Sequence, residues 1–80
     1  MKIELKLYAS LSKYMPQALL EKKPGYLEIQ EGTTIKALLN ELKVPLETVK
    51  LIFVNGVHAK DDDLLEEGDR LGVFPPVAGG

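Results

Sequence analysis

Residues 49–59 read VKLIFVNGVHA, a pattern that predicts a β-hairpin. Residues 49–54 are almost continuously apolar, which favours a strand buried on both faces and central in its sheet. Asn55 and Gly56 both tolerate positive φ, so an Asn-Gly pair between two strand-like runs is a strong hairpin signal. The chain is therefore expected to turn at this pair and return along residues 57–59.

An amphipathic helix is expected just before this hairpin. Its apolar residues recur at the spacing of one helical face. They are Ile35, Leu38, Leu39 and Leu42. Thr33 or Thr34 can cap the helix by offering a hydroxyl oxygen to free backbone amides. Pro45 is expected to end it, because the residue before a proline resists helical geometry.

Further toward the amino terminus, residues 2–7 alternate polar and apolar side chains and predict a half-buried strand. Residues 9–15 predict a short helical turn that a proline ends. Residues 17–23 are ambiguous, and a Pro-Gly turn follows them. Residues 26–30 alternate again and predict a second strand that runs against the first.

Residues 70–74 form the last predicted strand. The order is then strand, strand, helix, strand, short strand, strand, with the helix packed on one face of a mixed sheet. If the first two strands form a hairpin, the last strand lies beside the first at the centre. This is an α+β fold of the β-grasp type, as in ubiquitin, with about five strands. We expect a β-grasp domain over residues 1–74 and an extended tail over residues 75–80.

Composition narrows the possible functions. The net charge of −2 argues against nucleic acid as a partner, because phosphate binding needs a basic face. The chain has no cysteine, hence no disulfides or thiolate chemistry. No apolar run is long enough for a signal peptide or a membrane span, so we expect no membrane partner and a cytoplasmic location.

A cluster of acidic residues, without Lys or Arg among them, falls between the hairpin and the last strand. It consists of Asp61, Asp62, Asp63, Glu66, Glu67 and Asp69. Two interpretations stay open: a solvated loop, or a face that steers the protein toward a basic partner. The spacing does not fit a calcium loop, and we expect no metal site.

No catalytic set is visible in the chain. Ser10 and Ser12 lack a neighbouring base, and the one histidine, His58, follows the hairpin turn. No glycine-rich run opens the helix to cradle a phosphate. We therefore expect no bound cofactor and no enzyme activity of the chain alone.

Residues 74–80 read FPPVAGG, and this tail is the chemically distinctive part of the sequence. Two prolines remove two backbone donors, so strand pairing should stop after Phe74, and an arm of roughly 20 Å follows. Glycines without side chains let a terminal carboxylate enter a narrow slot. A frayed end is the plainer alternative. A partner enzyme that uses ATP could adenylate Gly80 and so supply AMP as a leaving group. This argument reaches an activated terminus without identifying what attacks it.

The tail, the run at residues 51–56 and the Glu67-Gly68-Asp69 turn together resemble the MoaD/ThiS family of ubiquitin-like sulfur carriers. The resemblance covers essentially the whole chain, and the tail is most similar to that of the molybdopterin synthase small subunit. Residues 19–25 are a departure that matches no family segment with confidence.

The resemblance implies that Gly80 becomes an acyl-adenylate and then a thiocarboxylate, while Gly79 supplies clearance. The arm that enters partner active sites would comprise Phe74, Pro75, Pro76, Val77 and Ala78. The implied partners are an E1-like adenylating enzyme, which uses ATP, and the large subunit of molybdopterin synthase, which passes the sulfur to a pterin precursor. A sulfur carrier for thiamine or tRNA thiolation, a ubiquitin-like protein modifier and a binding module with an inert tail remain alternatives. Phe74 is either part of a docking patch on the open face of the sheet or a core residue.

Overall fold

The computed structural model describes residues 1–17, 19 and 26–76. The predicted Pro-Gly turn and the tail residues 77–80 lie outside the described residues. The described elements are β1 (Lys2–Leu7), η1 (Ala9–Tyr14), β2 (Tyr26–Glu28), α2 (Ile35–Glu41), η2 (Leu46–Thr48), β3 (Leu51–Val54), β4 (Val57–His58) and β5 (Arg70–Phe74). Here η marks a 3₁₀ helix. All five predicted strands are present, although the second, third and fourth are shorter than expected.

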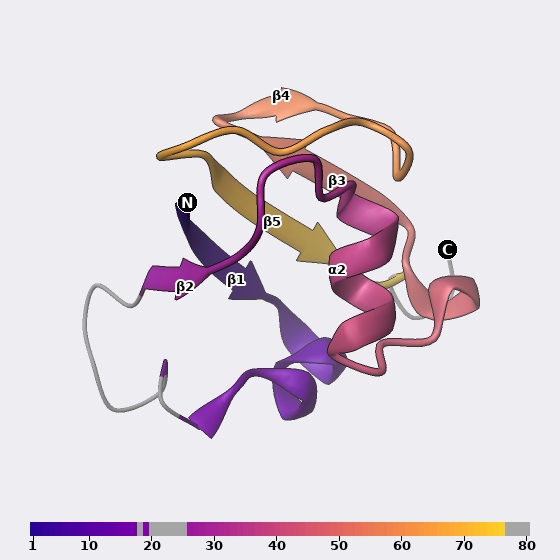
Figure 1. The fold of residues 1–80 in the computed structure, drawn as a ribbon. Coiled ribbons are helices and arrows are strands. Elements are labelled where there is room, and N and C mark those ends of the chain that lie inside the picture. The colour runs from indigo at the N-terminus through magenta and orange to yellow at the C-terminus, as the bar shows by residue number, and fades with distance from the viewer. Residues whose placement is uncertain (18, 20–25, 77–80) are drawn as a thin grey trace.

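The five strands form one sheet in the order β2-β1-β5-β3-β4. β1 and β5 are parallel neighbours, whereas the other three pairs are antiparallel. Figure 1 shows α2 lying across one face of this sheet. The first and last strands therefore meet at the centre, which confirms the predicted β-grasp fold.

The core lies between α2 and the sheet. Along β1, every second residue is buried, and the register places Leu5 beside Leu71 and Leu7 beside Val73 of β5. Strand pleating turns alternate side chains to one face, which is why a local alternation in sequence becomes a continuous apolar layer. The buried residues are Ile3, Leu5, Leu7, Leu11, Leu19, Ile35, Leu38, Leu39, Val44, Ile52, Leu65, Leu71 and Val73.

The start of α2 agrees with the prediction of a threonine cap. Thr34 is the N-cap residue, and its side-chain oxygen accepts a hydrogen bond from the Ala37 backbone N–H at 3.1 Å. The Thr33 hydroxyl instead donates to the Gln30 carbonyl oxygen at 2.6 Å. Thr34 thus satisfies one of the amides that lack a partner at a helix start.

The end of α2 differs from the prediction. The helix ends at Glu41, before Pro45, because Lys43 adopts a left-handed φ of 64°. The Val44 N–H donates to the Leu39 carbonyl at 2.9 Å, and the Lys43 N–H donates to the Asn40 carbonyl at 3.0 Å. This is a Schellman pair of hydrogen bonds, and it turns Val44 into the core.

The prediction that residues 49–54 form a strand buried on both faces was also wrong. β3 pairs with β5 and β4, so β5 and not β3 is the middle strand of the order. Ile52 is buried, but Leu51 on the opposite face is 40% exposed. The continuous apolarity of this run arises because its second face carries Leu51 and Phe53, which lie away from α2 on the open face of the sheet.

Candidate functional site: the tail root and the open face of the sheet

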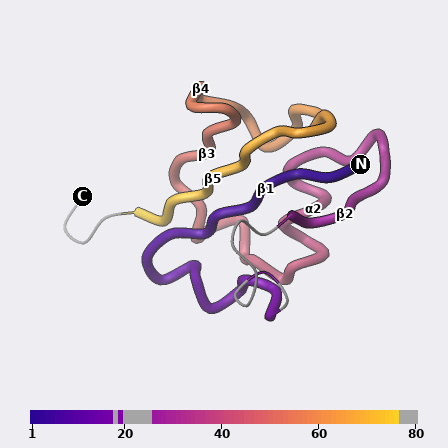
Figure 2. Tube along the Cα trace, turned by 90° about the vertical axis from the view of Figure 1, so that its left-hand side faces the viewer, coloured from indigo at the N-terminus to yellow at the C-terminus, as the bar shows by residue number. Residues whose placement is uncertain are grey.

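The tail begins where the sheet stops. Phe74 is the last residue of β5 and pairs with Leu51, and its carbonyl oxygen accepts the Lys50 N–H at 2.8 Å. Pro75 is half-buried and Pro76 exposed, and neither belongs to a strand. Figure 2 shows β5 carrying the chain to the side of the molecule away from the amino terminus. The predicted end of strand pairing after Phe74 is thus found in the described residues.

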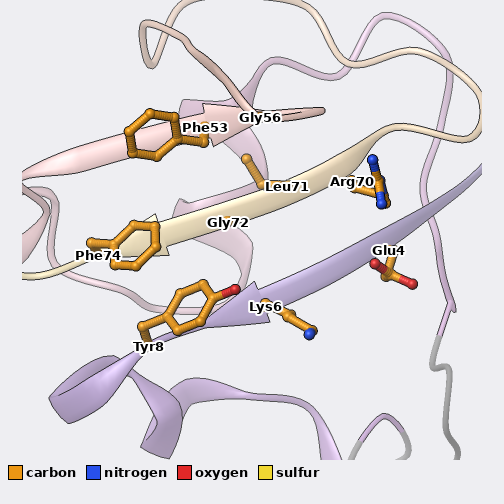
Figure 3. A pocket seen from close by; sticks show the side chains of 9 residues that line it. All are labelled: Glu4, Lys6, Tyr8, Phe53, Gly56, Arg70, Leu71, Gly72 and Phe74. Carbon is orange, nitrogen blue, oxygen red and sulfur yellow. The ribbon is translucent and has the colours of Figure 1, made fainter.

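Beside this point, the sheet face opposite α2 is hollowed. Figure 3 shows the hollow and its side chains. Its lining comes from β1, β3 and β5 with their flanking residues: Glu4, Lys6, Tyr8, Phe53, Gly56, Arg70, Leu71, Gly72 and Phe74. Phe74 therefore lies both at the base of the tail and in this surface.

Three aromatic rings form what we call the aromatic patch: Tyr8, Phe53 and Phe74. The Tyr8 and Phe74 rings are stacked, with centroids 4.2 Å apart and planes within 3°. The Phe53 ring meets Phe74 edge-on at 5.7 Å and 90°. Such pairs contribute about 0.5–1.5 kcal/mol beyond the burial of their area. The patch therefore holds the Phe74 ring in one orientation at the base of the tail.

Gly72 lies beneath the two stacked rings. It lies between Lys6 of β1 and Phe53 of β3 in the sheet register. A Cβ atom at this position would lie 3.4 Å from Cε2 of Tyr8 and 3.8 Å from Cε2 of Phe74. Both are ordinary van der Waals distances, so the two stacked rings lie directly over the backbone of β5 at Gly72.

Tyr8 is held by its backbone as well as by its ring. Its N–H donates to the Val73 carbonyl and its carbonyl accepts the Leu11 N–H, both at 3.0 Å. The next residue, Ala9, has a φ of 51°, a left-handed conformation that is unfavourable for a residue with a Cβ. This turn sends the chain into η1 directly after Tyr8, so the ring stays over Gly72.

The two interpretations of Phe74 can now be separated. Its β5 neighbours Leu71 and Val73 are buried in the core, whereas Phe74 is only half-buried and packs on Tyr8. Phe74 is part of the surface patch. Sequence reasoning missed Tyr8 and Phe53. The alternation of residues 2–7, continued by one residue, would have placed Tyr8 on the face opposite the core, whereas the unbroken apolar run around Phe53 gave no such signal.

Charged side chains border the aromatic patch. Glu4 lies opposite Arg70 in the β1–β5 register, and Lys6 lies opposite Gly72. Lys6 and Arg70 are exposed, while Glu4 is half-buried. The surface thus combines an apolar centre with a polar rim, which is the composition of many protein–protein interfaces.

The serines and the histidine considered as catalytic candidates do not form a catalytic site. Ser10 and Ser12 are exposed in η1, and His58 packs its ring against Phe53 at 5.8 Å. Within residues 1–17, 19 and 26–76, no group of three or more His, Asp or Glu side chains is placed to hold a metal ion. No helix in this part of the chain is long and apolar enough to cross a membrane.

The acidic loop, residues 61–69, contributes to the structure through some of its carboxylates. Asp69 is only 7% exposed and accepts the Glu66 N–H at 2.8 Å. Glu67 accepts the Lys2 N–H at 3.1 and 3.3 Å, and Asp63 accepts the Lys60 N–H at 3.0 Å. Three of the six carboxylates therefore hold loop or strand backbone, while the steering role remains a prediction.

Of the predicted tail residues, Phe74, Pro75 and Pro76 are placed by the structure, and Val77, Ala78, Gly79 and Gly80 lie outside its described part. The roles assigned to all seven stay predictions.

Comparison with known proteins places this geometry in context. Residues 17–80 match the ThiS family. The putative molybdopterin converting factor, subunit 1, from Pyrococcus furiosus is 27% identical, with a TM-score of 0.64 over 95% of this chain and 98% of that one. No curated protein matches the sequence.

Two further structures share the fold. SAMP1 from Haloferax volcanii is 22% identical, with a TM-score of 0.65 and full coverage of both chains. The complex of subunits 1 and 2 of molybdopterin-converting factor from Helicobacter pylori contains a chain that is 21% identical, with a TM-score of 0.58 and full coverage of both. From its family match and its β-grasp topology, the chain belongs to the ThiS family, among the MoaD/ThiS ubiquitin-like sulfur carriers.

Proposed function

We propose that this protein carries sulfur as a thiocarboxylate on Gly80 and donates it in molybdopterin biosynthesis, as the small subunit of a molybdopterin synthase. The observation that carries the proposal is the junction at Phe74. In a chain of the ThiS family, β5 stops there, and two prolines and a terminal Gly-Gly follow. Phe74 is fixed by stacking at the base of the tail, and the tail extends beyond it. This arrangement suits delivery of a terminal group into another protein.

The chemistry requires activation by a partner. A Gly80 carboxylate oxygen attacks the α-phosphorus of ATP, and pyrophosphate leaves. Hydrosulfide then attacks the carbonyl carbon of the acyl-adenylate and AMP leaves. Loss of the remaining proton on sulfur gives the terminal thiocarboxylate. Gly80 offers both faces of its carbonyl to attack because it has no side chain. In this proposal, an E1-like enzyme supplies the catalytic residues.

The aromatic patch is the proposed docking surface for these partners. An exposed apolar patch next to a reactive arm fixes the body of the carrier while the arm enters the partner's active site. The exposed Lys6 and Arg70 at its rim favour a partner surface with acidic side chains. The Helicobacter pylori complex of subunits 1 and 2 supports a large subunit as one such partner.

Mass spectrometry of the intact protein tests the proposal. Incubation with ATP, an adenylating enzyme and a sulfide source should replace one oxygen by sulfur, and a variant lacking Gly79 and Gly80 should show no change. Adding residues after Gly80 should abolish the conversion while leaving the melting temperature unchanged. An unmodified wild-type protein under conditions that convert a known carrier would contradict the proposal.

A ubiquitin-like protein modifier is the second candidate, because the fold is shared with Haloferax volcanii small archaeal modifier protein 1. Both functions begin with adenylation, so the fate of Gly80 separates them. Isopeptide bonds from Gly80 to lysines of other proteins, without thiocarboxylate, would favour the modifier. Sulfur transfer to a pterin precursor in the presence of a large subunit would favour the synthase over a thiamine or tRNA pathway.

A further inference from the structure

The side chain of Asn55 joins three segments of the fold. Its Nδ2 donates to Asp69 Oδ1, and its Oδ1 accepts the Arg70 backbone N–H, both at 2.9 Å. The other oxygen of Asp69 accepts the Glu66 N–H at 2.8 Å. We call this set of three hydrogen bonds the Asn55 junction. It ties the turn between β3 and β4 to the first residue of β5 and to the acidic loop.

The junction uses both ends of an amide. The side chain at position 55 must both donate and accept a hydrogen bond, because its neighbours are a carboxylate oxygen of Asp69 and the backbone N–H of Arg70. Because Asp69 is 7% exposed, the hydrogen bond from Asn55 also satisfies a carboxylate with little access to water. The Asn55 N–H adds a backbone bond to the Arg70 carbonyl at 2.9 Å.

The residue after Asn55 makes this junction chemically vulnerable. Gly56 has no side chain to hinder its backbone nitrogen, and both residues lie exposed in the turn, with φ of 54° and 82°. After losing its proton to solvent, the Gly56 nitrogen can attack Cγ of Asn55. The Cγ–Nδ2 bond breaks and ammonia leaves, and water then opens the cyclic imide to aspartate or isoaspartate. The reaction consumes water, releases ammonia and needs no oxidant.

We infer that Asn55 is a deamidation site whose reaction is restrained by the fold and whose product breaks the Asn55 junction. For Cγ to reach the Gly56 nitrogen, the side chain must leave Asp69 and the Arg70 N–H. Opening of the turn therefore precedes the reaction. The product replaces the Nδ2 donor by a carboxylate oxygen facing Asp69, so an attraction becomes a repulsion between like charges. Closure of the turn is then disfavoured, and the change is one-way.

Peptide mass spectrometry after incubation at mildly alkaline pH tests whether the fold slows the deamidation of Asn55. Conversion of Asn55 should be about tenfold or more slower in buffer than in concentrated urea, because only the opened turn reacts. Asn40 in α2, which precedes Glu41, is an internal reference and should stay intact in both conditions. Equal rates for Asn55 in buffer and urea would overturn the restraint.

Two variants test whether the deamidation product breaks the Asn55 junction. Asn55→Asp should lower Tm by about 5–15 °C, the range expected in a domain of this size when a partly buried hydrogen bond is lost and two carboxylates face each other. The double variant Asn55→Asp with Asp69→Asn exchanges the two groups. The amide now at position 69 would donate to the carboxylate now at position 55 and accept the Glu66 N–H, so most of the lost Tm should return. An unchanged Tm in the single variant, or no recovery in the double variant, would overturn the inference.

Discussion

The two faces of the sheet use the same strands for different purposes. On the α2 side, Leu71 and Val73 of β5 are buried among residues of β1, β3 and the helix. On the open side, Gly72 and Phe74 alternate with them and meet Tyr8 and Phe53. One face is closed and determines stability, whereas the other is half-exposed and leads into the tail. Substitutions on the two faces should therefore affect different measurements.

The largest effect is expected on the closed face. Leu39→Ala removes a fully buried side chain and leaves a cavity against the sheet, so the free energy of unfolding should fall by about 2–5 kcal/mol. Urea unfolding followed by circular dichroism measures this. The fraction that remains folded should still accept sulfur on Gly80, and a folded variant without conversion would contradict the separation of the two faces.

The open face is tested by Tyr8→Ala. Loss of a stacked aromatic anchor should weaken binding to the proposed adenylating enzyme about tenfold or more, because buried aromatic residues dominate interface energies. The unfolding free energy should fall by only about 1 kcal/mol. Tyr8→Phe keeps the stacked ring and is the matched control, which should bind like wild type. Calorimetric titration distinguishes the variants, and unchanged binding of Tyr8→Ala would remove the patch from the docking surface.

The rim charges should have a smaller effect that depends on salt. Lys6→Glu reverses a charge beside the patch, so association with the proposed adenylating enzyme should slow several-fold at low ionic strength and recover toward wild type at high salt. Lys36→Glu makes the same charge change on the exposed side of α2 and should leave the rate nearly unchanged. Stopped-flow association kinetics compare the two, and equal slowing would point to net charge alone.

The smallest effect is expected at the turn that presents Tyr8. Ala9→Gly relieves the positive φ and should raise the unfolding free energy by about 0.5–1 kcal/mol, with partner binding unchanged. Ala9→Val should lower it, because a β-branched residue suits this conformation least. A Gly variant less stable than wild type would show that the turn carries no strain.

Several elements followed from local sequence patterns. The alternation in β1, the threonine cap and apolar stripe of α2, and the Asn-Gly turn were predicted because each depends on neighbours within a few residues. The early end of α2 was not predicted, because the left-handed conformation of Lys43 and the burial of Val44 depend on packing. The position of β3 was missed because an apolar run reads alike whether its second face meets a helix or an open aromatic surface.

The sequence by itself determined which residues could alternate, turn and cap, and that strand pairing must stop at the two prolines after Phe74, since these depend on the covalent geometry of adjacent residues. Only the tertiary structure decided that Tyr8, Phe53 and Phe74 meet over Gly72, and that Asn55 bridges to Asp69. These contacts join residues far apart in the chain, and they depend on the register of β1, β5 and β3 across the sheet. Register is set by how the whole core packs, because a shift of one residue would exchange the two faces.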